Sequence, residues 1–237
     1  MPTTIHNISA FLKQATACLR EYKATPEGKP TQAIKQLYSR RFLQDVGIEI
    51  EGPTHDEIAA LPPAIFVANH ASMLDALLIC AFFDTDLRIL AKSGLFRAPY
   101  IGRILQREKH IRVYRGKNAH DRNRQIRDDI GAAIAEGASV FMFPEGTRTP
   151  DGAMHDFKLG AFFNAIQMQV PIIPVAIHGT FEAMPKTGIA IRPGKCKLEL
   201  LAPIAPPMNP SDERSAAETL ALDTKKAIEA ALGSKEC

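Results

Sequence analysis

The stretch Phe66-Val-Ala-Asn-His-Ala-Ser-Met-Leu-Asp75 indicates the fold class, because an apolar run stops at a polar Asn-His pair and a helical segment follows almost at once. The run Ala64–Ala68 has the length and composition of a buried strand. Ser72 and Asp75 have the spacing of a capping box, so we expect a helix to start here with Asp75 pointing back toward the loop. In that position its carboxylate can hold one nitrogen of His70 and leave the other free to accept a proton. A structural histidine beside a capping aspartate is the alternative.

A second apolar run, Val140–Phe143, also ends at charged residues, in the sequence Pro-Glu-Gly-Thr-Arg148. Site residues of α/β proteins gather where the strands of the sheet end. Gly146 permits a tight turn or the close approach of a ligand, and Arg148 can make bidentate contacts to a phosphate. This stretch predicts an anion-binding turn, and a solvent-facing turn with an incidental ion pair is the alternative.

After Gly47, short apolar runs alternate with amphipathic segments. Runs of this length are typical of buried strands, and the amphipathic segments suit helices. The alternation predicts the α/β class, with a mixed, largely parallel central sheet and helices on both faces. We expect strands at Ala64–Ala68, Leu87–Leu90, Ile111–Tyr114, Ser139–Phe143, Ile172–Ile177 and Cys196–Leu200, and helices at Met73–Phe83, Asn123–Glu136, Ala161–Gln169 and Arg214–Leu232.

The first 45 residues follow a different pattern and predict a basic, amphipathic helical hairpin. Apolar positions from Ile5 to Tyr22 recur at helical spacing. Residues 25–30 have turn chemistry, and Thr31 is placed to cap a second helix. Residues 1–45 hold seven basic and three acidic residues, a net charge of +4. We expect this hairpin to pack on the rest of the chain or to lie in a membrane interface.

The composition is that of an ordinary globular protein. Of the 237 residues, 46% are hydrophobic and 23% are charged, and the mean hydropathy is -0.09. These values argue against a disordered chain and a polytopic membrane protein, and no apolar run reaches the ~18 residues of a spanning helix. Cys18, Cys80, Cys196 and Cys237 lie far apart without CxxC spacing. We therefore expect no zinc site and no disulfide framework, and a reducing cytoplasm fits.

Positive charge is concentrated between Arg88 and Arg127, where twelve basic residues accompany two acidic ones. The simplest interpretation is a solvated face. The alternative is a surface for phosphates, an acidic carrier protein or anionic lipid. Nucleic acid is disfavoured, because the stretch offers few aromatic side chains for stacking and matches no recognition motif.

Four blocks of the sequence, in order, resemble the glycerolipid acyltransferase family. His70-Ala-Ser-Met-Leu-Asp75 is similar to the HX4D block of that family, and Ile111-Arg-Val-Tyr-Arg-Gly116 is similar to its second block. Phe143-Pro-Glu-Gly-Thr-Arg148 is similar to the third block, and Val170-Pro-Ile-Ile-Pro-Val175 to the fourth. Phe157-Lys-Leu-Gly160 resembles the segment that follows the third block. The branch that the sequence most resembles is the 1-acyl-sn-glycerol-3-phosphate acyltransferases.

The resemblance covers roughly Gly47 to Pro203 and implies a glycerolipid acyltransferase-like domain, to which we assign residues 46–237. Such a domain transfers a fatty acyl group from an acyl-CoA or acyl-carrier-protein thioester to the free hydroxyl of a 1-acylglycerol-3-phosphate, giving phosphatidic acid. It implies that His70 is the general base and Asp75 its orienting partner, with no covalent intermediate. It also implies an acceptor site whose arginines hold the phosphate; the candidate substrate-binding residues are Arg115, Glu145, Gly146, Thr147, Arg148 and Lys158. We expect no bound cofactor and no metal, since a thioester is already activated.

The expected partners are the thioester donor, with acyl-carrier protein as one of its forms, the lysophospholipid acceptor and an anionic membrane surface. We expect the protein in the cytoplasm, peripheral on the inner face of the membrane. Two alternatives stay open. One is the same chemistry on another acceptor, such as a lyso-aminolipid or a natural-product hydroxyl, and the other is a non-catalytic, lipid-binding peripheral protein. Lipid binding alone requires neither His70 nor Asp75, which favours an enzyme.

Overall fold

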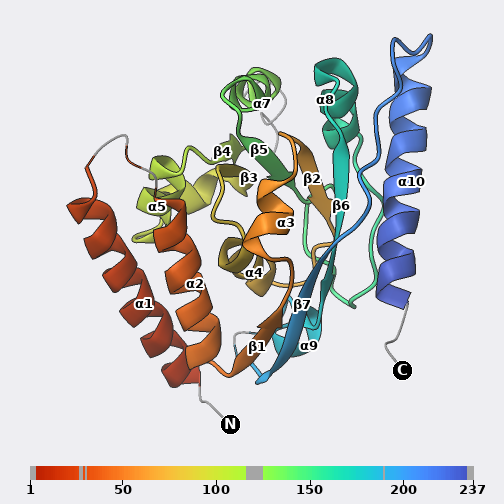
Figure 1. The fold of residues 1–237 in the computed structure, drawn as a ribbon. Coiled ribbons are helices and arrows are strands. Elements are labelled where there is room, and N and C mark those ends of the chain that lie inside the picture. The colour runs from red at the N-terminus through yellow and green to blue at the C-terminus, as the bar shows by residue number, and fades with distance from the viewer. Residues whose placement is uncertain (1–3, 27–28, 30, 116–124, 189, 234–237) are drawn as a thin grey trace.

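A twisted sheet forms the centre of the protein (Figure 1). The computed structural model describes residues 4–26, 29, 31–115, 125–188 and 190–233. Within these residues, seven strands are ordered β1-β7-β6-β2-β5-β3-β4 across the sheet. Neighbouring strands run parallel except β6 and β7, which are antiparallel, so the prediction of a mixed, largely parallel sheet is confirmed. The strands are β1 Ile48–Glu51, β2 Ile65–Ala68, β3 Leu87–Lys92, β4 Ile111–Val113, β5 Ser139–Met142, β6 Ile172–His178 and β7 Gly194–Leu200.

Helices connect the strands and cover the sheet. They are α1 Thr4–Ala24, α2 Gln32–Asp45, α3 His55–Ala59, α4 Leu74–Phe82, the 3-10 helix η1 Ser93–Arg97, α5 Ile101–Arg107, α7 Ile126–Ala135, α8 Gly160–Met168, α9 Thr180–Ala183 and α10 Glu213–Gly233. Each predicted strand and helix is found, with ends that differ by a few residues; residues 123 and 124 of one predicted helix lie outside the described residues. The elements β1, α3, η1, α5 and α9 were not predicted; β1 does alternate apolar and acidic residues, over four positions only, whereas the others are short helical turns without a clear hydrophobic period.

The two faces of the sheet carry separate hydrophobic cores. Phe66 and Ala68 of β2 belong to the core beneath α1, α2 and α4, whereas Ile65 and Val67 belong to the core beneath α7, α8 and α10. Alternate residues of a strand point to opposite faces, so the central strands β2, β5 and β6 each contribute to both cores. In Figure 1, α1, α2 and α4 lie on one side of β2 and β6, while α8 and α10 lie on the other. The predicted covering of both faces is confirmed.

The N-terminal hairpin packs on the body of the protein through α2. Phe42 and Leu43 of α2 are buried in the core that α4 also lines. α1 lies against α2, and its buried face includes Gln14, whose side-chain amide donates to Asp45 at 2.6 Å. The buried face of α1 therefore combines the polar side chains of Asn7 and Gln14 with apolar ones, among them Cys18 and Tyr22.

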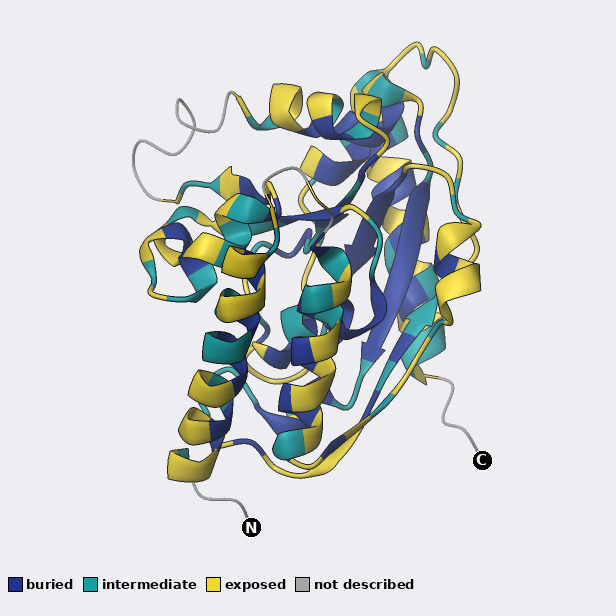
Figure 2. Ribbon diagram, turned by 60° about the vertical axis from the view of Figure 1, so that its left-hand side comes forward, coloured by how far each residue is buried: buried dark blue, intermediate teal, exposed yellow. Residues whose placement is uncertain are grey.

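The N-terminal part of the predicted apolar stripe of α1 faces outward, whereas Tyr22 at its other end is buried. Ile5, Ile8 and Leu12 keep 79%, 54% and 44% of their surface exposed, and Leu37 of α2 keeps 39%. Figure 2 shows the helix that starts beside the N label with yellow, exposed segments along its outer side. Exposed apolar side chains grouped on one surface are typical of an interaction site. Within the part of the chain that the structure describes, no helix is both long and apolar enough to cross a membrane.

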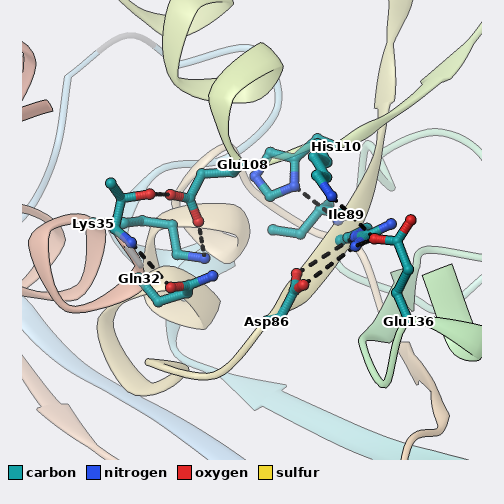
Figure 3. Close-up of polar contacts among 10 residues, drawn as sticks. Gln32, Lys35, Asp86, Ile89, Glu108, His110 and Glu136 are labelled. Atoms are coloured by element: carbon teal, nitrogen blue, oxygen red, sulfur yellow. Dashed lines mark hydrogen bonds and ion pairs between the residues drawn. The ribbon is translucent and has the colours of Figure 1, made fainter. Parts of the chain in front are cut away.

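A buried ion pair connects the hairpin to the body (Figure 3). Lys35 of α2 donates to Glu108 at 3.3 Å, and their side chains are only 4% and 2% exposed. The hydroxyls of Tyr22 and Thr31 also donate to Glu108. Thr31 was predicted to cap α2, but its side chain makes no capping bond; its hydroxyl is directed to Glu108 instead. The neighbouring His110 is buried, and burial, followed by the charge of Lys35, lowers its pKa to about 3.

Candidate active site

His70 and Asp75 form a close pair at the carboxyl end of β2. Nδ1 of His70 lies 2.7 Å from Oδ2 of Asp75, whose side chain is fully buried, while the His70 side chain is 20% exposed. A carboxylate partner favours the tautomer with the proton on Nδ1. The nitrogen that remains able to accept a proton is then Nε2. The pair predicted from the sequence therefore has the geometry of a base with its orienting group.

The first turn of α4 holds the Asp75 carboxylate in place. Oδ2 of Asp75 accepts hydrogen bonds from the backbone amides of Ala71 at 2.8 Å and Ser72 at 2.9 Å. The carboxylate half of the predicted capping box is thus present. The other half differs, because the Ser72 hydroxyl accepts from the amide of Leu74 and donates to the carbonyl of Met184 at 2.7 Å. Ser72 connects the loop to a distant segment instead of closing the box.

The backbone of His70 is held on both sides by the loop after β5. Its amide donates to Oε1 of Glu145 at 2.7 Å, and its carbonyl accepts from the amide of Thr149 at 2.9 Å. The His70 ring stacks on Phe143 with a centroid distance of 4.0 Å and an interplanar angle of 19°. β2 and β5 are parallel neighbours, so their carboxyl ends bring these loops together. Residues predicted from two separate stretches of sequence meet at one edge of the sheet.

Asn69 fixes the same loop from the other neighbouring strand. Its side-chain amide donates to the carbonyl of Ile177 at 2.9 Å, and its side-chain oxygen accepts from the Ile177 amide at 2.9 Å. This reciprocal pair continues the contact between β2 and β6 beyond the last paired residues of the strands. The position of His70 is therefore determined by contacts with both neighbours of β2. Asn69, the residue just before His70, makes the contact with β6.

Glu145 points into the protein rather than toward solvent. It is 4% exposed, and its two oxygens accept from the amides of His70 and His155, the latter at 3.0 Å. Burial raises the pKa of the Glu145 carboxyl, and these two amides act in the opposite direction. We predicted Glu145 as an acceptor-binding residue, and its contacts in the structure position the loop that carries His70.

Gly146 and Lys158 meet at the tip of the turn after β5. Gly146 has a φ of +73°, which favours glycine, and a Cβ added there would lie 2.6 Å from Nζ of Lys158. The missing side chain therefore makes room for the ammonium group. Arg115, which follows β4, donates from its guanidinium to the carbonyl of Gly146. Three of the predicted substrate-binding residues are thus brought together.

Thr147 and Arg148 complete the turn, and a lysine that the sequence did not indicate lies beside them. Nζ of Lys186 donates to the carbonyl of Arg148 at 2.7 Å and lies 3.4 Å from the Thr147 hydroxyl. Lys186 follows α9, far along the chain from the turn, and belongs to no recognisable motif. Only the three-dimensional fold reveals this neighbour.

Cys196 lies in the core near the site without the properties of a nucleophile. It is 2% exposed on β7. Burial, followed by the charges of Asp75 and Glu182, raises the pKa of its thiol to about 12. Only the thiolate is strongly nucleophilic, so this thiol is unreactive at neutral pH. Among the described residues, no group of three or more His, Cys, Asp or Glu side chains is placed to hold a metal ion.

Comparison with known proteins identifies the family. A family model described as Acyltransferase matches residues 48–178, more than half of the chain, and the matched range contains His70, Asp75 and the turn 145–148. The chain belongs to the Acyltransferase family. The predicted resemblance is therefore confirmed.

Individual relatives agree with this membership. A 1-acyl-sn-glycerol-3-phosphate acyltransferase from Limnanthes alba is 31% identical over 163 residues, covering 69% of this chain and 56% of that protein. The 1-acyl-sn-glycerol-3-phosphate acyltransferase alpha of Mus musculus is 29% identical over 170 residues, covering 71% of this chain and 59% of that protein. The chain thus spans somewhat more than half the length of these relatives.

The fold is also that of a solved structure. The crystal structure of the 1-acyl-sn-glycerophosphate acyltransferase PlsC from Thermotoga maritima matches with a TM-score of 0.79 and 21% sequence identity. The match covers 99% of this chain and 96% of that chain. It includes the N-terminal hairpin as well as the sheet, and it confirms the predicted acyltransferase fold.

Proposed function

We propose that the protein transfers a fatty acyl group from an acyl-CoA or acyl-carrier-protein thioester to the free hydroxyl of a 1-acylglycerol-3-phosphate, giving phosphatidic acid. The observation that carries the proposal is the His70–Asp75 pair at 2.7 Å, placed beside a turn surrounded by cationic side chains. A non-catalytic lipid-binding protein has no use for an oriented base. The names of the relatives support the same acceptor.

His70 acts as the base in direct transfer. Nε2 takes the proton of the acceptor hydroxyl while its oxygen attacks the thioester carbonyl carbon, forming a tetrahedral intermediate. The intermediate collapses with cleavage of the carbon–sulfur bond, and the departing thiolate takes the proton from His70. Asp75 stabilises the imidazolium that forms between these steps. No bound cofactor and no covalent enzyme intermediate are required.

The cationic turn supplies the acceptor site. Arg115 and Lys158 reach the turn 145–148, which itself contains Arg148 and whose acidic member, Glu145, has its carboxylate turned into the protein. A phosphate monoester carries between one and two negative charges at neutral pH, so it suits this group of cations. Holding the phosphate here places the hydroxyl of a short glycerol backbone within reach of the His70 loop.

The test is an acceptor comparison on the purified full chain. With acyl-CoA as the donor, we expect thiol release and formation of phosphatidic acid, followed by mass spectrometry, when 1-acylglycerol-3-phosphate is added. Thiol release only with a lyso-aminolipid or a non-lipid hydroxyl would favour the same chemistry on another acceptor. No turnover of either acyl-CoA or acyl-carrier-protein thioesters, together with lipid binding, would favour the non-catalytic alternative.

We also propose that the hairpin holds the protein on the inner face of an anionic membrane, from the cytoplasm. Ile5, Ile8 and Leu12 form an exposed apolar stripe on α1, and residues 1–45 carry a net charge of +4. Each basic residue near an anionic surface contributes about 1 kcal/mol to binding. Long-chain acceptors and products partition into bilayers, so a docked enzyme meets its substrate there.

Replacing Ile5, Ile8 and Leu12 with asparagine in the full chain is expected to weaken binding to anionic vesicles by at least about tenfold, because three apolar side chains no longer enter the interface. Co-sedimentation with phosphatidylglycerol-containing vesicles at low salt measures this. Leu222→Asn is the matched control, since Leu222 is 51% exposed on α10. Equal binding by the triple variant and the wild type would contradict the hairpin as the anchor.

A further inference from the structure

Lys186 brings a cation to the turn 145–148 from outside the part of the chain that the family model matches. The model ends at residue 178, and Lys186 lies in the connection between α9 and β7. Its ammonium group donates to the carbonyl of Arg148 at 2.7 Å. Family membership therefore gives Lys186 no role, and its place beside the turn needs an explanation of its own.

The segment that carries Lys186 makes hydrogen bonds to the site at two points. The carbonyl of Met184 accepts from the Ser72 hydroxyl at 2.7 Å, next to the base-carrying loop. Two residues later, Lys186 reaches Arg148 and lies 3.4 Å from the Thr147 hydroxyl. The segment thus runs from the loop of His70 to the cationic turn. Lys186 is held in this position by the Met184 contact two residues before it and by the contacts of its own ammonium group.

The charge of Lys186 is not neutralised in the described part of the chain. Its carbonyl and hydroxyl partners are uncharged, and no carboxylate of a described residue pairs with it. The same holds for Arg115, Arg148 and Lys158. Elsewhere on the surface, lysines such as Lys109 and Lys225 pair with carboxylates. A group of unpaired cations around one turn is unfavourable unless an anion binds among them.

We propose that Lys186 is a substrate-binding residue that donates to a phosphate monoester held at the turn 145–148. The inference rests on the proposed function and adds one residue to its phosphate site. Two of the three N–H groups of the ammonium face Arg148 and Thr147, and the third is available for a phosphate oxygen. Two substrates carry phosphate monoesters, the acceptor headgroup and the 3′-phosphate of coenzyme A, and the test separates them.

The test is calorimetric binding to the purified full chain, with glycerol 3-phosphate, coenzyme A and dephospho-coenzyme A as probes. Lys186→Gln is expected to lower the affinity for the phosphate monoester that binds at the turn by on the order of tenfold or more. The substitution removes one charge-assisted hydrogen bond. Weaker binding of glycerol 3-phosphate alone assigns Lys186 to the acceptor. Weaker binding of coenzyme A, with dephospho-coenzyme A unaffected, assigns it to the donor.

Two further variants separate binding from a purely structural role. Lys186→Arg keeps the charge and is expected to recover most of the affinity. Lys195→Gln removes one positive charge from a side chain that is 86% exposed on β7, and it is expected to bind all three probes like the wild type. In kinetics, Lys186→Gln should raise the KM of the phosphorylated substrate more than it lowers kcat.

The proposal is overturned if the wild type binds neither phosphate monoester or if Lys186→Gln binds both unchanged. It is also overturned if Lys186→Gln lowers the melting temperature and affects all probes alike, because this is the pattern of a lysine that only holds the turn. Binding does not depend on turnover. A protein that fails to acylate 1-acylglycerol-3-phosphate while Lys186→Gln weakens phosphate binding would refute the proposed reaction and leave this inference standing.

Discussion

Replacing His70 with alanine is expected to lower kcat by about 10²–10⁴-fold, the typical contribution of a positioned general base. Nε2 of His70 is the proton acceptor in the proposed reaction, and the 2.7 Å contact with Asp75 on Nδ1 fixes its tautomer and direction. The side chain lies in a loop and is 20% exposed, so the fold should persist. Initial rates of thiol release with saturating substrates measure the effect, and circular dichroism checks the fold.

The chain offers a matched control for this variant. His55 also pairs with a carboxylate, 2.8 Å from Asp84, but its side chain is 62% exposed at the start of α3, before β2 begins. His55→Ala is expected to leave kcat within about twofold of the wild type, as for a surface substitution away from the site. The kcat of Asp75→Asn should lie between those of His70→Ala and His55→Ala, because the imidazole stays in place while its tautomer is no longer fixed. Wild-type turnover by folded His70→Ala protein would refute the role of His70 as the base.

The parts of the fold and site that follow a local pattern could be predicted from the sequence. The run Ala64–Ala68 and the helix after it are encoded by apolar residues of the right length, and the spacing of His70 and Asp75 is short enough for helix geometry to bring them together. Arg115, Gly146 and Lys158, which were predicted from separate stretches, also lie together. Contacts between residues of one loop, or of loops at neighbouring strand ends, can therefore be predicted from sequence patterns.

Other features depend on contacts between distant segments, which no local pattern contains. Glu145 turns inward because the amides of His70 and His155 offer two donors in a buried position. Lys186 reaches the turn only because the segment after α9 folds over it. The same limit explains the hairpin, where spacing predicted that Ile5, Ile8 and Leu12 would lie together but not that they would face outward. Which face of the hairpin is buried depends on how α2 packs against the core that α4 also lines.

The second large effect is expected on stability. Glu108→Ala should lower the free energy of unfolding by about 3–5 kcal/mol, the usual cost of leaving one partner of a buried ion pair without the other. Lys35 is 4% exposed, so water cannot solvate its ammonium group once the carboxylate is gone. The hydroxyls of Tyr22 and Thr31 also lose their acceptor. Urea unfolding, followed by circular dichroism, measures the change.

The neighbouring ion pairs in Figure 3 provide the comparison. Glu136 contacts Arg88 and Lys109, but half of its side chain is exposed, so Glu136→Ala should cost much less than Glu108→Ala. The double variant Lys35→Met with Glu108→Leu removes both buried charges, and it should recover much of the stability that Glu108→Ala loses. Equal losses for Glu108→Ala and Glu136→Ala would contradict a buried pair.

The same variants decide how the hairpin relates to the rest of the chain. If α1 and α2 were an independent anchor, losing the ion pair would melt them in a separate, earlier transition and leave the unfolding of the sheet unchanged. α2 shares the core of α4 through Phe42 and Leu43, and Glu108 lies just after α5. We therefore expect a single transition that shifts as a whole. Two separated transitions in Glu108→Ala would show that the hairpin folds apart from the domain that carries His70.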